Sequence, residues 1–207
     1  MNDPEILALM GHCLPMLALE RILNLGHLLM QTRDITGDNC EFGVFTGHTA
    51  VLIAALSPTK PLWLYDSFEG LPDLQEGDTT NPGSFFKGAM KSYWTEVTET
   101  FTAAKVLHRP IITVGQFNKV TPEQLPPQIA FAHIDCDLQQ SVTDALKLVW
   151  ARVAPRGIVV IDDFRHPELP GVERAVKDFA KWGQKAQINA LKGINGNAWH
   201  CFAVKGN

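Results

Sequence analysis

Residues 129–163 read IAFAHIDCDLQQSVTDALKLVWARVAPRGIVVIDD and contain two apolar runs that each end in acid. The first run, residues 129–134, stops at Asp135, and the second, residues 157–161, stops at Asp162 and Asp163. Short runs rich in β-branched residues are typical of buried strands in a parallel sheet, and a helix at 140–152 fits between them. The pattern therefore predicts a βαβ unit whose strands both end in carboxylates.

These acidic strand ends also predict a ligand site, because open α/β sheets bind ligands at the carboxyl ends of their strands. Neighbouring carboxylates repel one another and lose solvation when buried, unless a cation lies between them. Oxygen ligands suit hard divalent cations, so we expect Asp135, Asp162 and Asp163 to hold one. The alternative for each is a helix N-cap or a solvated loop. Asp137 is expected to cap the following helix, with a place as fourth ligand as its alternative.

The rest of the chain continues the alternation of strands and helices. We predict one α/β domain over residues 1–207, with a helical cap at 1–36 and a doubly wound, mostly parallel sheet at 37–207 that finishes in an antiparallel edge hairpin. The long segment 70–90, rich in glycine and proline, is expected to form a lid or binding loop. Further helices are predicted at 3–13, 16–32, 49–56, 93–104 and 171–182, and further strands at 39–44, 61–65, 111–114, 186–191 and 198–204, the last two joined by a turn at 195–196.

Composition excludes several classes of partner. The net charge is −4, and no lysine- or arginine-rich run is interleaved with aromatics, so neither nucleic acid nor an anionic membrane is expected. No apolar stretch approaches the roughly 20 residues that a membrane span needs. The four cysteines are scattered, which indicates reduced thiols, and the amino terminus does not resemble a signal peptide, so we expect a cytoplasmic protein.

The first strand-to-helix turn and the end of the next strand indicate a nucleoside site. Gly43 and Gly47 allow a ligand to approach the backbone closely, and Asp66 stands where an acid accepts hydrogen bonds from ribose hydroxyls. Glu41 would repel a pyrophosphate and could pair with a cationic group, although a tight turn with a solvated Glu41 remains the alternative. These features favour a nucleoside that has a positive charge and no phosphate. S-adenosyl-L-methionine fits this description, and we expect it as the ligand.

Five motifs in the same order resemble those of the macrocin O-methyltransferase family. The resemblance runs from about residue 38 to about 182, and the motif at 65–72 is the most specific of the five. Members of that family are S-adenosylmethionine- and magnesium-dependent enzymes that methylate sugar hydroxyls, so a Rossmann-like class I methyltransferase fold is implied. The motifs are EFGVFTG at 41–47, YDSFEGLP at 65–72, GQF at 115–117, HIDCDL at 133–138 and IDDF at 161–164.

The resemblance also implies roles for individual residues. Asp135, Asp162 and Asp163 would bind Mg²⁺ or another divalent cation, and Asp135 would also border the methyl donor. The other donor-binding residues implied are Glu41, Phe42 and Gly43 at the methionine end, Asp66 at the ribose, and Ser67, Gly115, Gln116 and Phe117 around the adenine.

The expected reaction is methyl transfer to an alcohol, in which a cation bound to the acceptor oxygen stabilises the developing alkoxide. Asp135 is the predicted base, with His166 as the alternative, whereas His133 is expected to be a satisfied core histidine. Gln139 and Gln140 replace the Tyr-Glu of the family, so the acceptor stays open between a sugar hydroxyl and another small hydroxylated molecule such as a diol.

Two other functions are compatible with the same residues. One is a metal-dependent hydrolase that uses the acids on water, and the other is a non-catalytic nucleoside-binding protein. The apolar amino-terminal helices are the expected interface if the protein forms a homo-oligomer.

Overall fold

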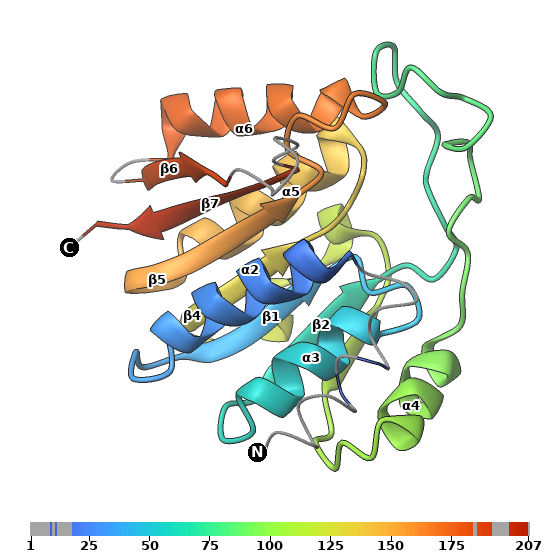
Figure 1. Cartoon of the computed structure of the whole chain (residues 1–207). Helices are drawn as coiled ribbons and strands as arrows, with labels where there is room; N and C mark the ends of the chain where they lie inside the picture. The colour runs from blue at the N-terminus through green and yellow to red at the C-terminus, as the bar shows by residue number, and fades with distance from the viewer. Residues whose placement is uncertain (1–8, 10, 12–17, 184–185, 192–198, 207) are drawn as a thin grey trace.

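The computed structural model describes residues 9, 11, 18–183, 186–191 and 199–206, and these form a twisted sheet with helices on both faces (Figure 1). The sheet has seven strands in the order β3-β2-β1-β4-β5-β7-β6. The strands are β1 (Asp38–Phe42), β2 (Leu62–Asp66), β3 (Ile111–Val114), β4 (Ile129–Ile134), β5 (Val153–Asp162), β6 (Ala186–Ala190) and β7 (His200–Lys205), and the helices are α2 (Leu19–Gln31), α3 (His48–Leu56), α4 (Trp94–Ala103), α5 (Gln139–Trp150) and α6 (Pro170–Trp182), with 3-10 turns η1 (Phe117–Lys119) and η2 (Pro122–Gln124).

The pairing confirms the predicted doubly wound sheet and its antiparallel hairpin. Strands β3, β2, β1, β4 and β5 are parallel, and β7 runs antiparallel to both β5 and β6. Strand β7 therefore lies between β5 and β6, which leaves β6 at the edge. Ile134 pairs with Ile161, so the register places the acidic ends of β4 and β5 next to each other.

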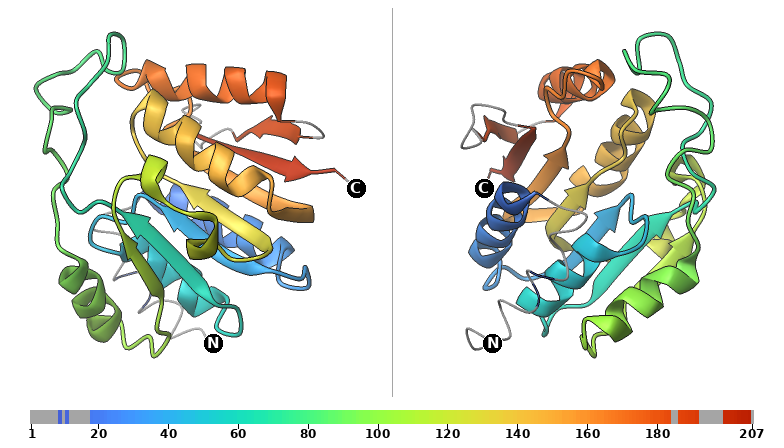
Figure 2. Two further views of the ribbon diagram at one scale, coloured as in Figure 1. Left: turned by 180° about the vertical axis from the view of Figure 1, so that it is seen from behind. Right: turned by 45° about the vertical axis from the view of Figure 1, so that its right-hand side comes forward.

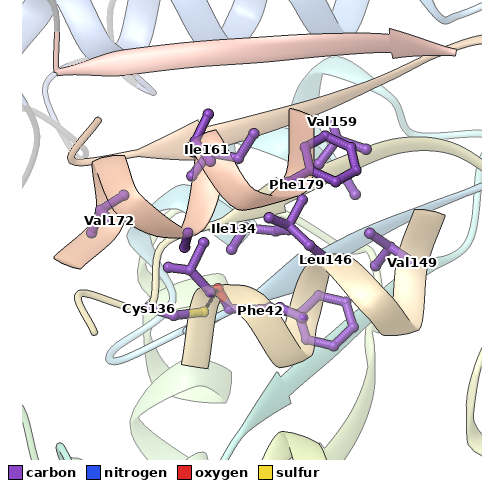
Figure 3. Packing of buried hydrophobic residues seen from close by; sticks show 14 of the residues in the cluster. Phe42, Ile134, Cys136, Leu146, Val149, Val159, Ile161, Val172 and Phe179 are labelled. Atoms are coloured by element: carbon purple, nitrogen blue, oxygen red, sulfur yellow. Dashed lines mark hydrogen bonds between the residues drawn. The ribbon is translucent and has the colours of Figure 1, made fainter. Parts of the chain in front are cut away.

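Each face of the sheet has its own apolar core. Helices α2, α3 and α4 cover one face, where Leu25 and Leu29 pack with Ile158 and Val160 of β5. Helices α5 and α6 cover the other face, as the two views of Figure 2 show. There Phe42, Ile134 and Ile161 pack against Leu146, Val149, Val172 and Phe179 (Figure 3).

The start of β5 was predicted wrongly at residue 157, since the strand begins at Val153. A proline inside a run normally argues against a strand, because it donates no ladder hydrogen bond. Here the register with β4 shifts between Ile129 and Phe131, which face Val153 and Ile158, and the irregularity accommodates Pro155.

The helical cap is seen in part. Helix α2 lies within the predicted 16–32 segment, and Ile22, Leu25, Leu28 and Leu29 form its buried face. The predicted helix at 3–13, except positions 9 and 11, and the hairpin turn at 195–196 lie outside the described residues. None of the described helices is long and apolar enough to cross a membrane.

The long connection between β2 and α4 extends along the carboxyl edge of the sheet (Figure 1). Its base is closed by hydrogen bonds from Leu71 N to Ala89 O (2.8 Å) and from Gly88 N to Leu71 O (2.9 Å). Farther along, Thr80 N donates to Glu168 O (3.0 Å), just before α6. The loop is thus fastened at both its base and its far end, directly beside the acidic strand ends.

Candidate functional site

A cavity of about 790 Å³ opens at the carboxyl edge of the sheet. The segments that follow β1 to β5 all contribute to its lining, as does the long loop after β2. Sheet order reverses between β1 and β4, which is where doubly wound folds bind ligands. The volume is in the range of a small-molecule or cofactor pocket.

Gly43 lets the ends of β1 and β4 meet at the cavity. It has φ 81°, and a Cβ at this position would lie 1.7 Å from the backbone oxygen of Asp135. Asp135 N donates to Phe42 O (2.8 Å), and Cys136 Sγ contacts the same oxygen at 3.2 Å (Figure 3). Only glycine allows this approach, which places Asp135 against the first strand-to-helix turn.

Asp66 organises the neighbouring turn. Its Oδ2 accepts hydrogen bonds from Val44 N (2.7 Å) and Phe45 N (3.0 Å), and its Oδ1 accepts one from Phe68 N (2.8 Å). A carboxylate offers about four lone-pair positions, so acceptor capacity remains on the side that faces the cavity. The other predicted donor-site residues that line the same cavity are Gly43, Ser67, Gly115, Gln116, Phe117 and Asp135.

Glu41 and Phe42 lie behind the cavity wall and are fully buried. Glu41 Oε1 lies 2.9 Å from His133 Nδ1, and burial raises the pKa of the Glu41 carboxyl. Its Oε2 has no partner among the described residues. Phe42 stacks on Tyr65, with ring centroids 4.3 Å apart. The structure does not bring these two side chains into the cavity lining.

Four aspartates gather where β4 and β5 end: Asp135, Asp137, Asp162 and Asp163. Ligand atoms of His133, Asp135 and Asp162 lie within 4.8 Å of one another. Burial, followed by the charges of Asp162 and Asp163, raises the pKa of Asp135 well above its usual range. The structure thus assembles two buried carboxylates, Asp162 and Asp163, and two half-buried ones, Asp135 and Asp137, whose mutual repulsion a cation would relieve.

Arg21 of α2 pairs with two of these acids, and no local sequence pattern pointed to it. Its Nη1 lies 2.8 Å from Asp162 Oδ2, and its Nη2 lies 2.8 Å from Asp163 Oδ1. From β7, His200 Nε2 lies 2.9 Å from Asp162 Oδ1. Against the effect of burial, His200 and Arg21 hold the pKa of Asp162 below its ordinary value.

Asp137 does not cap α5, contrary to the sequence prediction. It lines the cavity with φ 56°, and no described residue donates a hydrogen bond to its carboxylate. Burial and the charges of Asp163 and Asp162 raise its pKa to about 7. Asp163 also lines the cavity with φ 56°, and such left-handed backbone in non-glycine residues often accompanies functional sites.

The cap of α5 comes from Asp78 in the long loop. Its Oδ1 accepts a hydrogen bond from Gln139 N (3.1 Å), and its Oδ2 accepts one from Gln75 N (2.7 Å). Only 2% of Asp78 is exposed. A residue distant in sequence therefore satisfies the first turn of the helix and ties the loop to it.

Asp78→Ala is expected to lower the free energy of unfolding by about 1–2 kcal/mol, because it removes a helix cap and leaves two backbone N–H groups without this acceptor. Urea unfolding measures this loss, and faster proteolysis within the loop would show its release. Asp73→Ala is the matched control, because Asp73 is an exposed acid of the same loop that pairs with the exposed Lys87 and caps no helix. Equal losses in both variants would contradict this role of Asp78.

The acceptor side of the cavity is partly aromatic. Phe85 lines it and meets the His166 ring edge-on, with centroids 6.5 Å apart. His166 Nδ1 accepts a hydrogen bond from Glu168 N (3.2 Å), so the neutral ring carries its proton on Nε2. The nearby aromatics Phe86 and Trp94 are about half exposed and do not line the cavity.

A family model described as Macrocin-O-methyltransferase (TylF) matches residues 10–199 of the chain. The 8-demethyl-8-(2,3-dimethoxy-alpha-L-rhamnosyl)-tetracenomycin-C 4'-O-methyltransferase of Streptomyces olivaceus is 26% identical over 191 residues, which cover 86% of this chain and 72% of that protein. The mycinamicin III 3''-O-methyltransferase of Micromonospora griseorubida is 23% identical over 178 residues, covering 79% and 69%.

Solved structures show the same fold. The O-methyltransferase NovP superposes with a TM-score of 0.74 at 21% identity, covering 91% of this chain and 81% of that one. The calicheamicin methyltransferase CalS11 gives a TM-score of 0.74 at 21% identity, covering 90% and 79%.

Proposed function

Because the chain belongs to the macrocin O-methyltransferase family and is an S-adenosylmethionine-dependent O-methyltransferase, we propose that it methylates a hydroxyl of a sugar or other small hydroxylated molecule with the help of a divalent cation. The observation that carries the proposal is a single cavity lined by Asp66 on the donor side and by Asp135 and Asp163 on the acidic side. A methyl donor and a cation-bound alcohol would meet there.

The donor half fits S-adenosylmethionine. Asp66 retains acceptor capacity for a ribose hydroxyl, and Gly115 has φ 149° with open space where a Cβ would stand. Ser67, Gln116 and Phe117 lie around the same part of the cavity and would border the adenine. Glu41 and Phe42 would act from behind the wall, by supporting the turn that holds the methionine end.

The acidic half fits a divalent cation, most simply Mg²⁺. Asp135, Asp162 and Asp163 would hold it, since ligand atoms of Asp135 and Asp162 lie within 4.8 Å of each other and Asp163 shares the Arg21 guanidinium with Asp162. When bound, such a cation polarises the acceptor hydroxyl and orients it. His133 has a ring nitrogen within reach of the same place, although Glu41 occupies its Nδ1.

Two carboxylates facing the cavity are candidates for accepting the hydroxyl proton. Asp135 was the base predicted from the sequence, but a carboxylate that holds a cation has little basicity left. Asp137 is close by in sequence and also lines the cavity but, unlike Asp135, it is not among the three residues whose ligand atoms lie within 4.8 Å of one another. We therefore assign the cation to Asp135 and the proton to Asp137. His166 carries its proton on Nε2 and would donate a hydrogen bond to the acceptor.

A thermal-shift series tests the donor and the cation together. S-adenosylmethionine and S-adenosylhomocysteine at about 100 times their Kd are expected to raise Tm by about 5–10 °C, because such saturation stabilises by about 2.7 kcal/mol. Mg²⁺ is expected to add a separate increment. NAD is the control, since the turn after β1 offers no pyrophosphate site. Stabilisation by NAD alone would contradict the proposal, and so would the absence of stabilisation by both methionine derivatives.

The acceptor class is tested by transfer of a labelled methyl group to a panel of acceptors. Deoxysugar glycosides with free vicinal hydroxyls are expected to be labelled, and catechols serve as the competing diol class. Mg²⁺-dependent hydrolysis without methyl transfer would favour the hydrolase alternative instead.

A further inference from the structure

The side chain of Arg21 bridges the two consecutive acids at the end of β5. Each terminal nitrogen of the guanidinium lies 2.8 Å from one carboxylate, one from Asp162 and the other from Asp163. Among the described residues, no other arginine or lysine pairs with the four aspartates of the site. The amino-terminal helix α2 thus supplies the permanent positive charge of this acidic cluster.

Both oxygens of Asp162 are already engaged. Oδ2 is held by Arg21, while Oδ1 accepts a hydrogen bond from Asp163 N (2.8 Å) and lies 2.9 Å from His200 Nε2. Asp162 is also one of the three residues whose ligand atoms come within 4.8 Å of one another. A cation that binds Asp162 must therefore share or take an oxygen from these groups.

Because Arg21 carries the positive charge among these groups, it is the group that an incoming cation would replace. Four carboxylates face one guanidinium here, and removing a charge partner from a buried acid is strongly destabilising unless another cation takes its place. An arginine cannot leave by losing its proton, so its side chain has to move. Such movement is feasible, because 23% of the Arg21 side chain is exposed, whereas α2 stays anchored through Ile22, Leu25, Leu28 and Leu29.

We propose that Arg21 is an internal counter-cation of the acidic site and that a divalent cation binds in competition with its guanidinium. The inference rests on the metal dependence proposed above. It assigns Arg21 a positioning role: the guanidinium holds Asp162 and Asp163 together in the metal-free protein, and metal loading releases it. Whether the site holds metal is thereby linked to the position of the Arg21 side chain on the amino-terminal helix α2.

Trp199 provides a reporter of the guanidinium position. The Cζ of Arg21 lies 5.6 Å from the centre of the Trp199 ring, and the His166 ring lies 4.3 Å from the same indole. Release of the guanidinium removes a cation from the indole face, which changes its emission.

The test is a calorimetric titration of Mg²⁺ or Mn²⁺ into the donor-free protein. Arg21→Gln is expected to bind the metal with a Kd at least about tenfold lower than wild type, because the competitor is gone, and Arg21→Lys should fall between them. Arg165→Gln is the matched control, since Arg165 follows the acid pair in sequence but is exposed and pairs with Glu173. Its Kd should equal that of wild type.

Unchanged or weaker binding in Arg21→Gln, with wild type binding normally, would overturn the competition alone. Absence of binding in both proteins would overturn the competition together with the proposed metal dependence. If Arg21→Gln does not fold, metal is titrated into wild type and followed by tryptophan emission, with Trp199→Phe as the control. A change that Trp199→Phe abolishes supports release of Arg21, whereas calorimetric binding without any change at Trp199 overturns it.

Discussion

Asp162→Asn is expected to abolish metal-dependent methyl transfer while leaving the affinity for S-adenosylmethionine nearly unchanged. Asp162 is central to the acidic cluster, where it contacts Arg21, His200 and the backbone of Asp163. An amide keeps the shape but lacks the charge and is a poor ligand for a hard cation. Losing several kcal/mol of transition-state stabilisation corresponds to a fall of at least about a hundredfold in turnover.

Steady-state rates across a Mg²⁺ titration, together with calorimetry of the donor, separate the two effects. Asp178→Asn is the control, because Asp178 is an exposed acid on α6 that pairs with Lys181 and does not line the cavity. A collapse of donor affinity in Asp162→Asn would identify the acids as donor-binding or structural residues. Full activity in that variant would contradict the proposed role of Asp162 in holding the cation.

Asp137→Asn is expected to lower kcat by about 10²–10⁴ while metal and donor affinities remain close to wild type, because general-base catalysis contributes on that scale. Asp135→Asn is expected to have a different effect, since its main consequence should be weaker metal binding. Both carboxylates follow β4 and line the cavity, so position alone does not separate them. Their roles are distinguished by what each variant still binds.

Single-turnover rates at saturating metal and donor measure the chemical step directly. Asp144→Asn is a matched control, because Asp144 also lines the cavity but accepts a hydrogen bond from Gln140 one turn away on α5. If Asp137→Asn kept its full rate and Asp135→Asn bound metal normally but turned over slowly, Asp135 would be the base.

Most of the fold could be predicted because its signals are local. Strand β4 coincides with the apolar run at residues 129–134, since burial on both faces requires continuous apolar sequence, and the edge strand β3 coincides with the predicted residues 111–114. The start of β5 could not be predicted in this way. Its first residues include Pro155, and only the register shift against β4 shows how a strand accommodates it.

The partners of the acids could not be predicted. Arg21 lies 141 positions from Asp162, and Asp78 lies 61 positions from the helix end that it caps. Neither pairing leaves a periodicity or a spacing in the sequence. The predicted cap by Asp137 was wrong for the same reason. Asp78 of the long loop accepts the hydrogen bond at the start of α5, and Asp137 lines the cavity instead.

By itself, the sequence determined the order of strands and helices and the meeting of acids at one edge of the sheet. Both follow from hydrophobic periodicity and from the rule that parallel strands end together. Only the tertiary structure decided which charges those acids meet and which of their carboxylates stay without a partner among the described residues. Those contacts join α2, the long loop and β7 to the ends of β4 and β5, and they exist only once the two faces of the sheet are packed.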